Sequence, residues 1–204
     1  MKRIFSILTL LLVSLGATLS AAETPVQILR RSADKIRSAK SLNIAYTATA
    51  DGHKYEGELV VQGNMFTITS PQMRSWYDGT TQWTYSSQIG EVNIITPTPE
   101  EVRQINPIAI LNSFTDNYNT SMLKSPSGKS VVRLTAKNRK ADIRSADITI
   151  DNRSLYPERI VLSMSNNQTV TIDIRDIRVG SQIPAENFRF NKSRYPNVQV
   201  VDLR

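Results

Sequence analysis

From residue 42 the sequence alternates apolar residues with polar or small ones, and tight turns interrupt the alternation every few residues. The stretch LNIAYTATADGHKYEGELVVQ is the clearest case, because two alternating runs flank Asp51-Gly52, a dipeptide typical of two-residue hairpin turns. A side-chain period of two belongs to a strand with one buried face. The pattern therefore predicts short antiparallel strands joined in sequence order, rather than a helical bundle or a parallel sheet.

The alternating pattern continues on both sides of one helical interruption. Strands are predicted first for MFTITS, MRSWY, QWTYSS and VNIIT, and later for YNTSML, SVVRLTAK, ADITID, ERIVLSMS and TVTIDIRDI. A sheet of about eight to eleven strands curls, and it then closes or leaves a concavity. We expect a mainly β (α+β) fold, namely a strongly curved antiparallel sheet or open, unclosed β-barrel with helices covering the concave face.

Two capping boxes mark the helices. Thr24 precedes Pro25 and is followed by Gln27, which predicts a helix over residues 24–40. Thr98 and Glu101 repeat this spacing. They predict a helical pair over 99–115, which restarts at the sequence NPIAILNSF.

The first 22 residues have the pattern of a secretory signal peptide: MKR, the apolar run IFSILTLLLVSL, and the small residues SAA. The apolar run is shorter than the roughly 20 residues that a spanning helix needs. Cleavage is expected after Ala22, which leaves residues 23–204 as a single exported, soluble domain. The chain contains no cysteine, so we expect a buried core instead of disulfides to hold it together, and no lipid-modified cysteine to anchor it.

Motifs typical of catalytic, metal-binding or cofactor-binding sites are scarce. The one histidine, His53, follows a turn, and no cysteine is available, so a zinc or redox-metal site lacks ligands. No nucleophile elbow, phosphate loop or dinucleotide fingerprint occurs, although residue counts alone leave a carboxylate-only enzyme open. The net charge of +7 is spread among acids. It indicates a solvated surface, or a basic face toward anionic headgroups, rather than nucleic-acid binding. We expect a monomeric, non-enzymatic protein without cofactor or metal.

Aromatic residues are concentrated in one part of the chain. A half-buried sheet face that fills its own core would explain them, and so would a concavity that holds an apolar guest. Both readings stay open on composition alone. The six residues are Tyr55, Phe66, Trp76, Tyr77, Trp83 and Tyr85.

The order of several motifs resembles the periplasmic lipoprotein carrier protein family called LolA. GELVVQGNMFTITSP matches a Gly-x-Leu/Val strand that leads into a Phe-containing strand and a proline, and DGTTQWTY matches the family's Asp-Gly-x-x-x-Trp-x-Tyr hairpin. NPIAILNSF lies where the family has a short Pro-led helix, and IPAENFRF with YPNVQVVD matches its closing segment. The resemblance covers nearly the whole of residues 23–204 in order.

The resemblance implies an open β-barrel that carries acyl chains of lipoproteins, or of another lipid, between the two membranes of a Gram-negative bacterium. Its implied partners are an inner-membrane release complex and an outer-membrane receptor. A lipid-sensing or structural envelope module of the same fold is the alternative. The implied lid helix contains Ile110, Leu111 and Phe114, and the implied walls of the apolar hollow are Leu59, Val61, Phe66, Ile68, Trp76, Trp83, Tyr85 and Ile94.

One motif departs from the family. Its well-studied members have an arginine just before the Phe-containing strand, where it holds the lid shut. This chain has Gly63 and Asn64 there, so lid closure by that contact is not expected. We still expect the lid helix to move when lipid binds, and Trp76 and Trp83 to share a face with Phe66.

Overall fold

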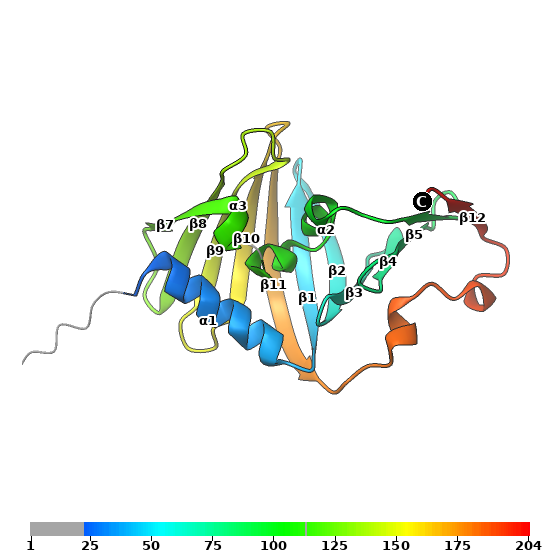
Figure 1. Cartoon of the computed structure of the whole chain (residues 1–204), viewed down its shortest axis with the longest axis horizontal. Coiled ribbons are helices and arrows are strands. Elements are labelled where there is room, and N and C mark those ends of the chain that lie inside the picture. Colours follow the sequence, from blue (N-terminus) through cyan, green and yellow to red (C-terminus); the bar gives the residue numbers. More distant parts are fainter. Residues whose placement is uncertain (1–22, 113) are drawn as a thin grey trace, which may run out of the picture.

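The computed structural model describes residues 23–112 and 114–204. The signal peptide predicted for 1–22 lies outside these residues. Twelve strands form one sheet in the order β12-β6-β5-β4-β3-β2-β1-β11-β10-β9-β8-β7 (Figure 1). Their bounds are β1 Ser41–Ala50, β2 His53–Gln62, β3 Met65–Thr69, β4 Met73–Tyr77, β5 Gln82–Ser86, β6 Glu91–Ile95, β7 Tyr118–Leu123, β8 Lys129–Ala136, β9 Ile143–Asp151, β10 Pro157–Met164, β11 Thr169–Gly180 and β12 Gln199–Asp202.

The hairpins form where the turn residues predict them. Asp51 and Gly52 connect β1 to β2 with φ of 50° and 78°. Two successive residues at positive φ match the twist of the flanking strands, and glycine adopts this backbone at little cost. Local turns also join β1 to β6 in order, and β7 to β11 likewise.

One seam joins these two groups of strands. β1 pairs with β11, which follows it by more than a hundred residues, and the register shifts by one residue between Ala45 and Tyr46. All pairings are antiparallel except that of β12, which runs parallel to β6. The prediction of an open, curved antiparallel sheet is confirmed; the parallel edge strand was not anticipated.

Helix α1 (Pro25–Ser38) begins at the predicted capping box, in which Gln27 and Thr24 satisfy each other's backbone amides. Its apolar stripe buries Ile28, Leu29 and Ala33 against the sheet and against α2, η1 and α3 (residues 99–112 and 114–117), which we call the lid segment. α1 and the lid elements lie on the concave face of the sheet (Figure 1). No helix of the described chain is long and apolar enough to cross a membrane.

The lid segment is less regular than predicted. α2 (Pro99–Ile105) has the expected Thr98–Glu101 capping box, but a 3₁₀ helix η1 (Pro107–Asn112) follows it, and then a single turn α3 (Phe114–Asn117). At the junction, the Asn106 Oδ1 accepts a hydrogen bond from the Ile108 amide at 3.2 Å. The backbone therefore turns sharply between α2 and η1.

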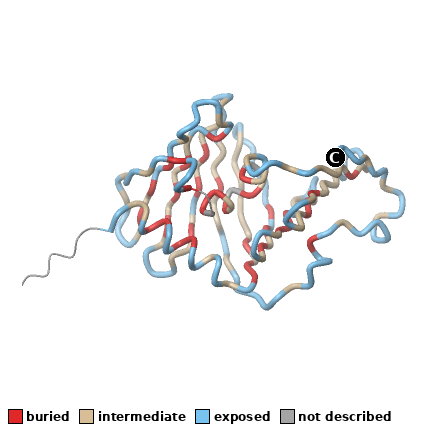
Figure 2. Tube along the Cα trace, viewed as in Figure 1, coloured by how far each residue is buried: buried red, intermediate tan, exposed pale blue. Residues whose placement is uncertain are grey.

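The two faces of the sheet differ. The concave face is mainly aliphatic and largely buried, and buried positions recur along the strands (Figure 2). The convex face of β8 to β11 instead carries exposed cross-strand ion pairs, such as Arg133–Asp147 at 2.6 Å. The convex face of β3 to β5 is covered by residues 181–198, which we call the C-terminal strap; it contains η2 (Ala185–Phe188) and η3 (Lys192–Arg194).

Candidate functional site

An apolar cavity of about 200 Å³ lies between the concave face and the lid. Strands from both halves of the sheet form its floor, and Ile105 of α2 and Ile108 of η1 cover it. Among its lining residues, the only side-chain oxygen or nitrogen is the Tyr46 hydroxyl oxygen, and burial raises the pKa of Tyr46 above its ordinary value. The lining residues are Ile44, Tyr46, Ala48, Leu59, Ile68, Ile105, Ile108, Ile160, Leu162, Met164, Val170, Ile172 and Ile174.

Strand register explains why these side chains meet. Ile44 lies directly opposite Leu59, and Leu59 lies opposite Ile68. On the other side of the seam, Ile160 of β10 lies opposite Ile172 of β11. Directly opposed residues project from the same face of a sheet, so the alternating apolar residues of five strands form one continuous surface.

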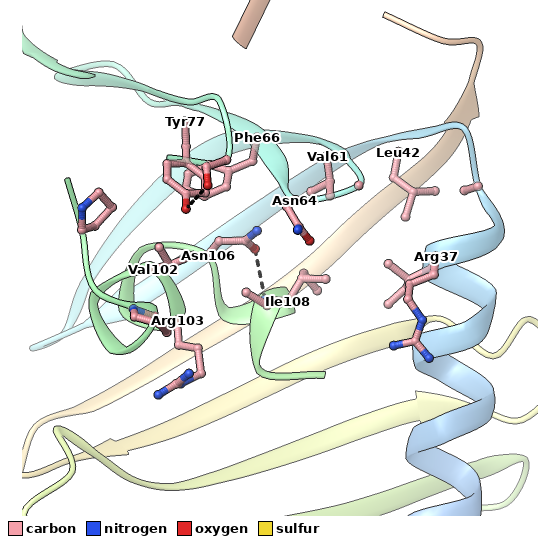
Figure 3. Close-up of a pocket in the computed structure, with 17 residues that line it drawn as sticks. Arg37, Leu42, Val61, Asn64, Phe66, Tyr77, Val102, Arg103, Asn106 and Ile108 are labelled. Carbon is pink, nitrogen blue, oxygen red and sulfur yellow. Dashed lines mark hydrogen bonds between the residues drawn. The ribbon is translucent and has the colours of Figure 1, made fainter. Parts of the chain in front are cut away.

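A wider opening of about 610 Å³ adjoins this cavity and shares Ile108 with it (Figure 3). Val61 and Phe66 line its sheet side, and the Phe66 ring lies 5.1 Å from that of Tyr77. Asn64 lines the opening from the turn before β3. At this position the family that the sequence resembles has an arginine that holds the lid shut, and this chain has none.

Two arginines give the opening a positive character. Arg37 at the end of α1 and Arg103 of α2 both line it (Figure 3). Arg37 pairs with exposed Asp34 at 2.5 Å. Arg103 is only 9% exposed and pairs with Glu100 of its own helix, while its Nε has no hydrogen-bond partner. The opening therefore combines an apolar wall with two cationic groups, one of them buried.

Four of the eight predicted wall residues lie on the concave side. Leu59 and Ile68 line the apolar cavity, whereas Val61 and Phe66 line the opening. Whether they contact a lipid stays a prediction.

The other four predicted wall residues lie on the opposite face. Phe66 is opposite Tyr77, whereas Trp76 is opposite Thr67 and also opposite Trp83. The expectation that Trp76 and Trp83 share a face with Phe66 is therefore wrong. Tyr85 and Ile94 follow the same alternation, since Ile94 is opposite Trp83 and Tyr85 is two residues from Trp83 on one strand.

These convex-face aromatics pack against the C-terminal strap. The Trp76 ring lies 5.6 Å from that of Phe190 and 5.8 Å from that of Tyr195, both edge-on. Tyr85 lies 5.0 Å from Tyr195. The aromatic residues of this part of the chain thus lie on both faces of the sheet. Phe66 and Tyr77 line the opening on the concave face, and Trp76 and Trp83 form a second layer on the convex face.

The predicted lid residues pack into the core and do not line the apolar cavity. Ile110, Leu111 and Phe114 are all at most 4% exposed and belong to the main core. Ile105 and Ile108, which were not among the predicted site residues, line the cavity instead.

β10 and β11 also contribute cavity residues that were not predicted. Ile160, Leu162 and Met164 alternate in ERIVLSMS, and Ile172 and Ile174 alternate in TVTIDI. This alternation was sufficient to place them on one face.

Within residues 23–112 and 114–204, no group of three or more histidine, aspartate or glutamate side chains could hold a metal ion. The arrangement is suited to binding an apolar guest, and the residues around the cavity present no assembled catalytic group.

Comparison with known proteins supports a single family. A family model described as outer membrane lipoprotein carrier protein LolA matches residues 21–168. A search of curated proteins gave no match.

Solved structures share the fold at low identity. An uncharacterized conserved protein from Thermus thermophilus is 9% identical, with a TM-score of 0.57 over 85% of this chain and 98% of that one. MucB is 14% identical, with a TM-score of 0.50 over 87% of this chain and 65% of MucB. A LolA superfamily protein from Nitrosomonas europaea is 15% identical, with a TM-score of 0.45 over 83% of this chain and 99% of that one.

Proposed function

Because the chain belongs to the LolA family of outer membrane lipoprotein carrier proteins, we propose that it carries the acyl chains of lipoproteins, or of a related lipid, from the inner to the outer membrane. The apolar cavity under α2 and η1 is the observation that carries this proposal. It is lined almost wholly by aliphatic side chains, and it lies on the side of the sheet that the lid covers.

The cavity provides the affinity that a carrier needs. Each buried methylene contributes about 0.8 kcal/mol, so ten shielded carbons contribute about 8 kcal/mol before the costs of association. The volume of about 200 Å³ is below the range of roughly 300–1,000 Å³ that is typical of ligand pockets. A lipid would therefore have to enlarge the cavity, and the adjoining opening is the natural direction for enlargement.

We infer that the lid moves when a guest binds. α2 and η1 span 7 and 6 residues, and helices of this length are marginal without tertiary packing. A guest would compete with Ile105 and Ile108 for the same apolar floor. Two lid states with different affinity for the guest would let a partner control uptake and release.

The family also suggests partners and a compartment. We propose that an inner-membrane release complex loads the protein and that an outer-membrane receptor unloads it. The signal-peptide pattern of residues 1–22 supports a periplasmic location.

Ile174→Lys tests the proposal. Ile174 is partly buried in the cavity floor, so a lysine there places a charge where the acyl chain would lie. Ile89→Lys is the matched control, because Ile89 is 67% exposed in a distant turn. Native mass spectrometry of protein purified gently from the cell envelope should show a lipid adduct on the wild type and on Ile89→Lys, but not on Ile174→Lys. Equal loading of all three proteins would place the lipid elsewhere.

Hydrogen exchange across residues 106–112 tests the lid. We expect protection of these amides to change when an acyl ligand is added, because the ligand displaces Ile108 from the floor. Amides of β9, which lies apart from the cavity, should be unaffected. Identical lid protection with and without ligand would indicate a fixed core segment.

MucB suggests the alternative of a sensing module, because it shares the fold and has been solved in a complex with MucA from Pseudomonas aeruginosa. In that case lipid would control the binding of a partner protein instead of being delivered. Transfer of a labelled acylated peptide between vesicles distinguishes the two, since only a carrier accelerates it.

A further inference from the structure

A second cavity lies on the convex face, on the other side of the sheet from the apolar cavity. It has a volume of about 470 Å³ and is enclosed by β2, β3 and β4 on one side and by the C-terminal strap on the other. Trp76 lies in its lining. Nothing in the proposed carrier function requires this cavity.

Specific contacts fix the walls of the convex-face cavity. The Gln62 side chain donates to the Ile183 carbonyl oxygen at 2.8 Å and accepts from the Ile183 amide at 2.7 Å, which attaches the strap to β2. Phe188 of the strap is 1% exposed. Further along, Tyr195 packs edge-on against Trp76. The strap is thus attached to the sheet at both ends of the cavity.

The lining of this cavity is strongly positive. It contains three arginines, Arg74, Arg189 and Arg194, against one carboxylate, Glu186. Within the described chain, Arg189 pairs with Asp78 at 2.9 Å, whereas Arg74 and Arg194 form no ion pair. Two guanidinium groups from separate parts of the chain therefore share the cavity without a counter-charge of their own.

The Arg74 side chain is held in place, but one of its hydrogen-bond donors has no partner. Its guanidinium carbon lies 5.2 Å from the centre of the Trp76 ring, which fixes the side chain over the aromatic surface. Its Nε is buried and has no hydrogen-bond partner. A buried donor without a partner is costly unless a ligand accepts from it.

We propose that the convex-face cavity is a binding site for a phosphate group, either as a free phosphate or as the headgroup of an anionic phospholipid. Planar guanidinium groups match the geometry of phosphate oxygens and bind them through paired hydrogen bonds. Arg74 supplies donors from the sheet and Arg194 from the strap, so the bound group joins the two layers. The site is separate from the apolar cavity and works whether or not that cavity holds a lipid.

Tryptophan emission reports on this site. The chain has two tryptophans, and Trp83→Phe leaves Trp76, in the cavity lining, as the only one. Inorganic phosphate is titrated into this variant, with sodium chloride at matched ionic strength as the control. In a second arm, the protein is sedimented with phosphatidylcholine vesicles that contain or lack phosphatidylglycerol. A saturable emission change with phosphate identifies a free-phosphate site, and binding only to phosphatidylglycerol vesicles identifies a headgroup site.

Arginine variants decide whether either response belongs to the cavity. Arg194→Gln and Arg74→Gln should each weaken the response about tenfold, because each removes a charged hydrogen-bond donor. Arg194→Gln leaves the stacking on Trp76 intact, so it remains informative if Arg74→Gln perturbs folding. Arg139→Gln is the control, since it removes the same charge from an exposed turn. The proposal is overturned if neither arm shows a response, or if Arg194→Gln responds as Arg139→Gln does.

Discussion

Gly57 of β2 lies directly across from Tyr46 of β1, and a Cβ atom placed on Gly57 would be 2.5 Å from the Tyr46 hydroxyl oxygen. The Tyr46 ring therefore occupies the space that a side chain at residue 57 would take. The same ring forms part of the wall of the apolar cavity. Glycine at this position fixes both the packing of the β1–β2 pair and the shape of the cavity.

Gly57→Ala should destabilise the fold by about 1–3 kcal/mol, which is typical of overpacking in a closely packed site. Urea unfolding measures the loss. The double variant with Tyr46→Ala should be less destabilised than the sum of the single variants, because it removes the clash. Strict additivity would show that Tyr46 and Gly57 do not compete for space.

Acyl ligands that enter the apolar cavity should leave the intrinsic tryptophan emission nearly unchanged. Both tryptophans project from the convex face, on the far side of the sheet from this cavity. Met164→Trp places a reporter in the cavity lining, and its emission should shift to shorter wavelength as ligand is added. A large response of the wild-type tryptophans with none from Met164→Trp would place the ligand on the convex face.

Gln62→Ala should release the C-terminal strap from β2. The substitution removes both hydrogen bonds to Ile183, and each contributes about 1 kcal/mol. Limited proteolysis should cut faster between residues 181 and 187, while the rest of the fold is kept. Gln72→Ala is the control, because Gln72 is an exposed glutamine away from the strap. Equal cutting of both variants would mean that the aromatic contacts alone hold the strap.

Acid should loosen the lid through Glu101. Hydrogen bonds donated by the backbone amide and then by the hydroxyl of Thr98 hold the pKa of Glu101 below its ordinary value. A lowered pKa in the folded state stabilises it above the unfolded pKa of roughly 4.3, and this contribution is lost as the pH falls through the folded value.

Glu101→Gln isolates the acid effect, because glutamine preserves a capping box, as Gln27 does in α1. Thermal unfolding from pH 6 to pH 3 should show the wild type losing its advantage over Glu101→Gln below roughly pH 4.3. A constant difference across this range would mean that the carboxylate does not stabilise α2.

The sequence predicted the strands and turns well because these depend on local chemistry. Asp51-Gly52 and the two capping boxes have the predicted conformations, and the period of two continues through β7 to β11. These features are encoded within a few residues of where they act.

The face on which a side chain projects was less predictable. Phe66 and Trp76 are separated by a turn, and one residue more or less in that turn exchanges the faces of the whole next strand. The irregular strap that buries Trp76 lies more than a hundred residues further along the chain, so no local sequence pattern predicts its contact with Trp76. The cavity itself combines β1 to β3 with β10 and β11, which meet only through the seam.

The seam between β1 and β11 has a consequence for the order of folding. The hairpins of β1 to β6 and of β7 to β11 close short loops, whereas pairing Ala48 with Ile172 closes a loop of more than a hundred residues. Long loops are entropically costly to close, so we expect the two groups of hairpins to form first and the seam to limit the folding rate. Pulse-labelled hydrogen exchange during refolding should then protect β9 before β1 gains its bonds to β11. Because the cavity spans the seam, it would form only after β1 pairs with β11.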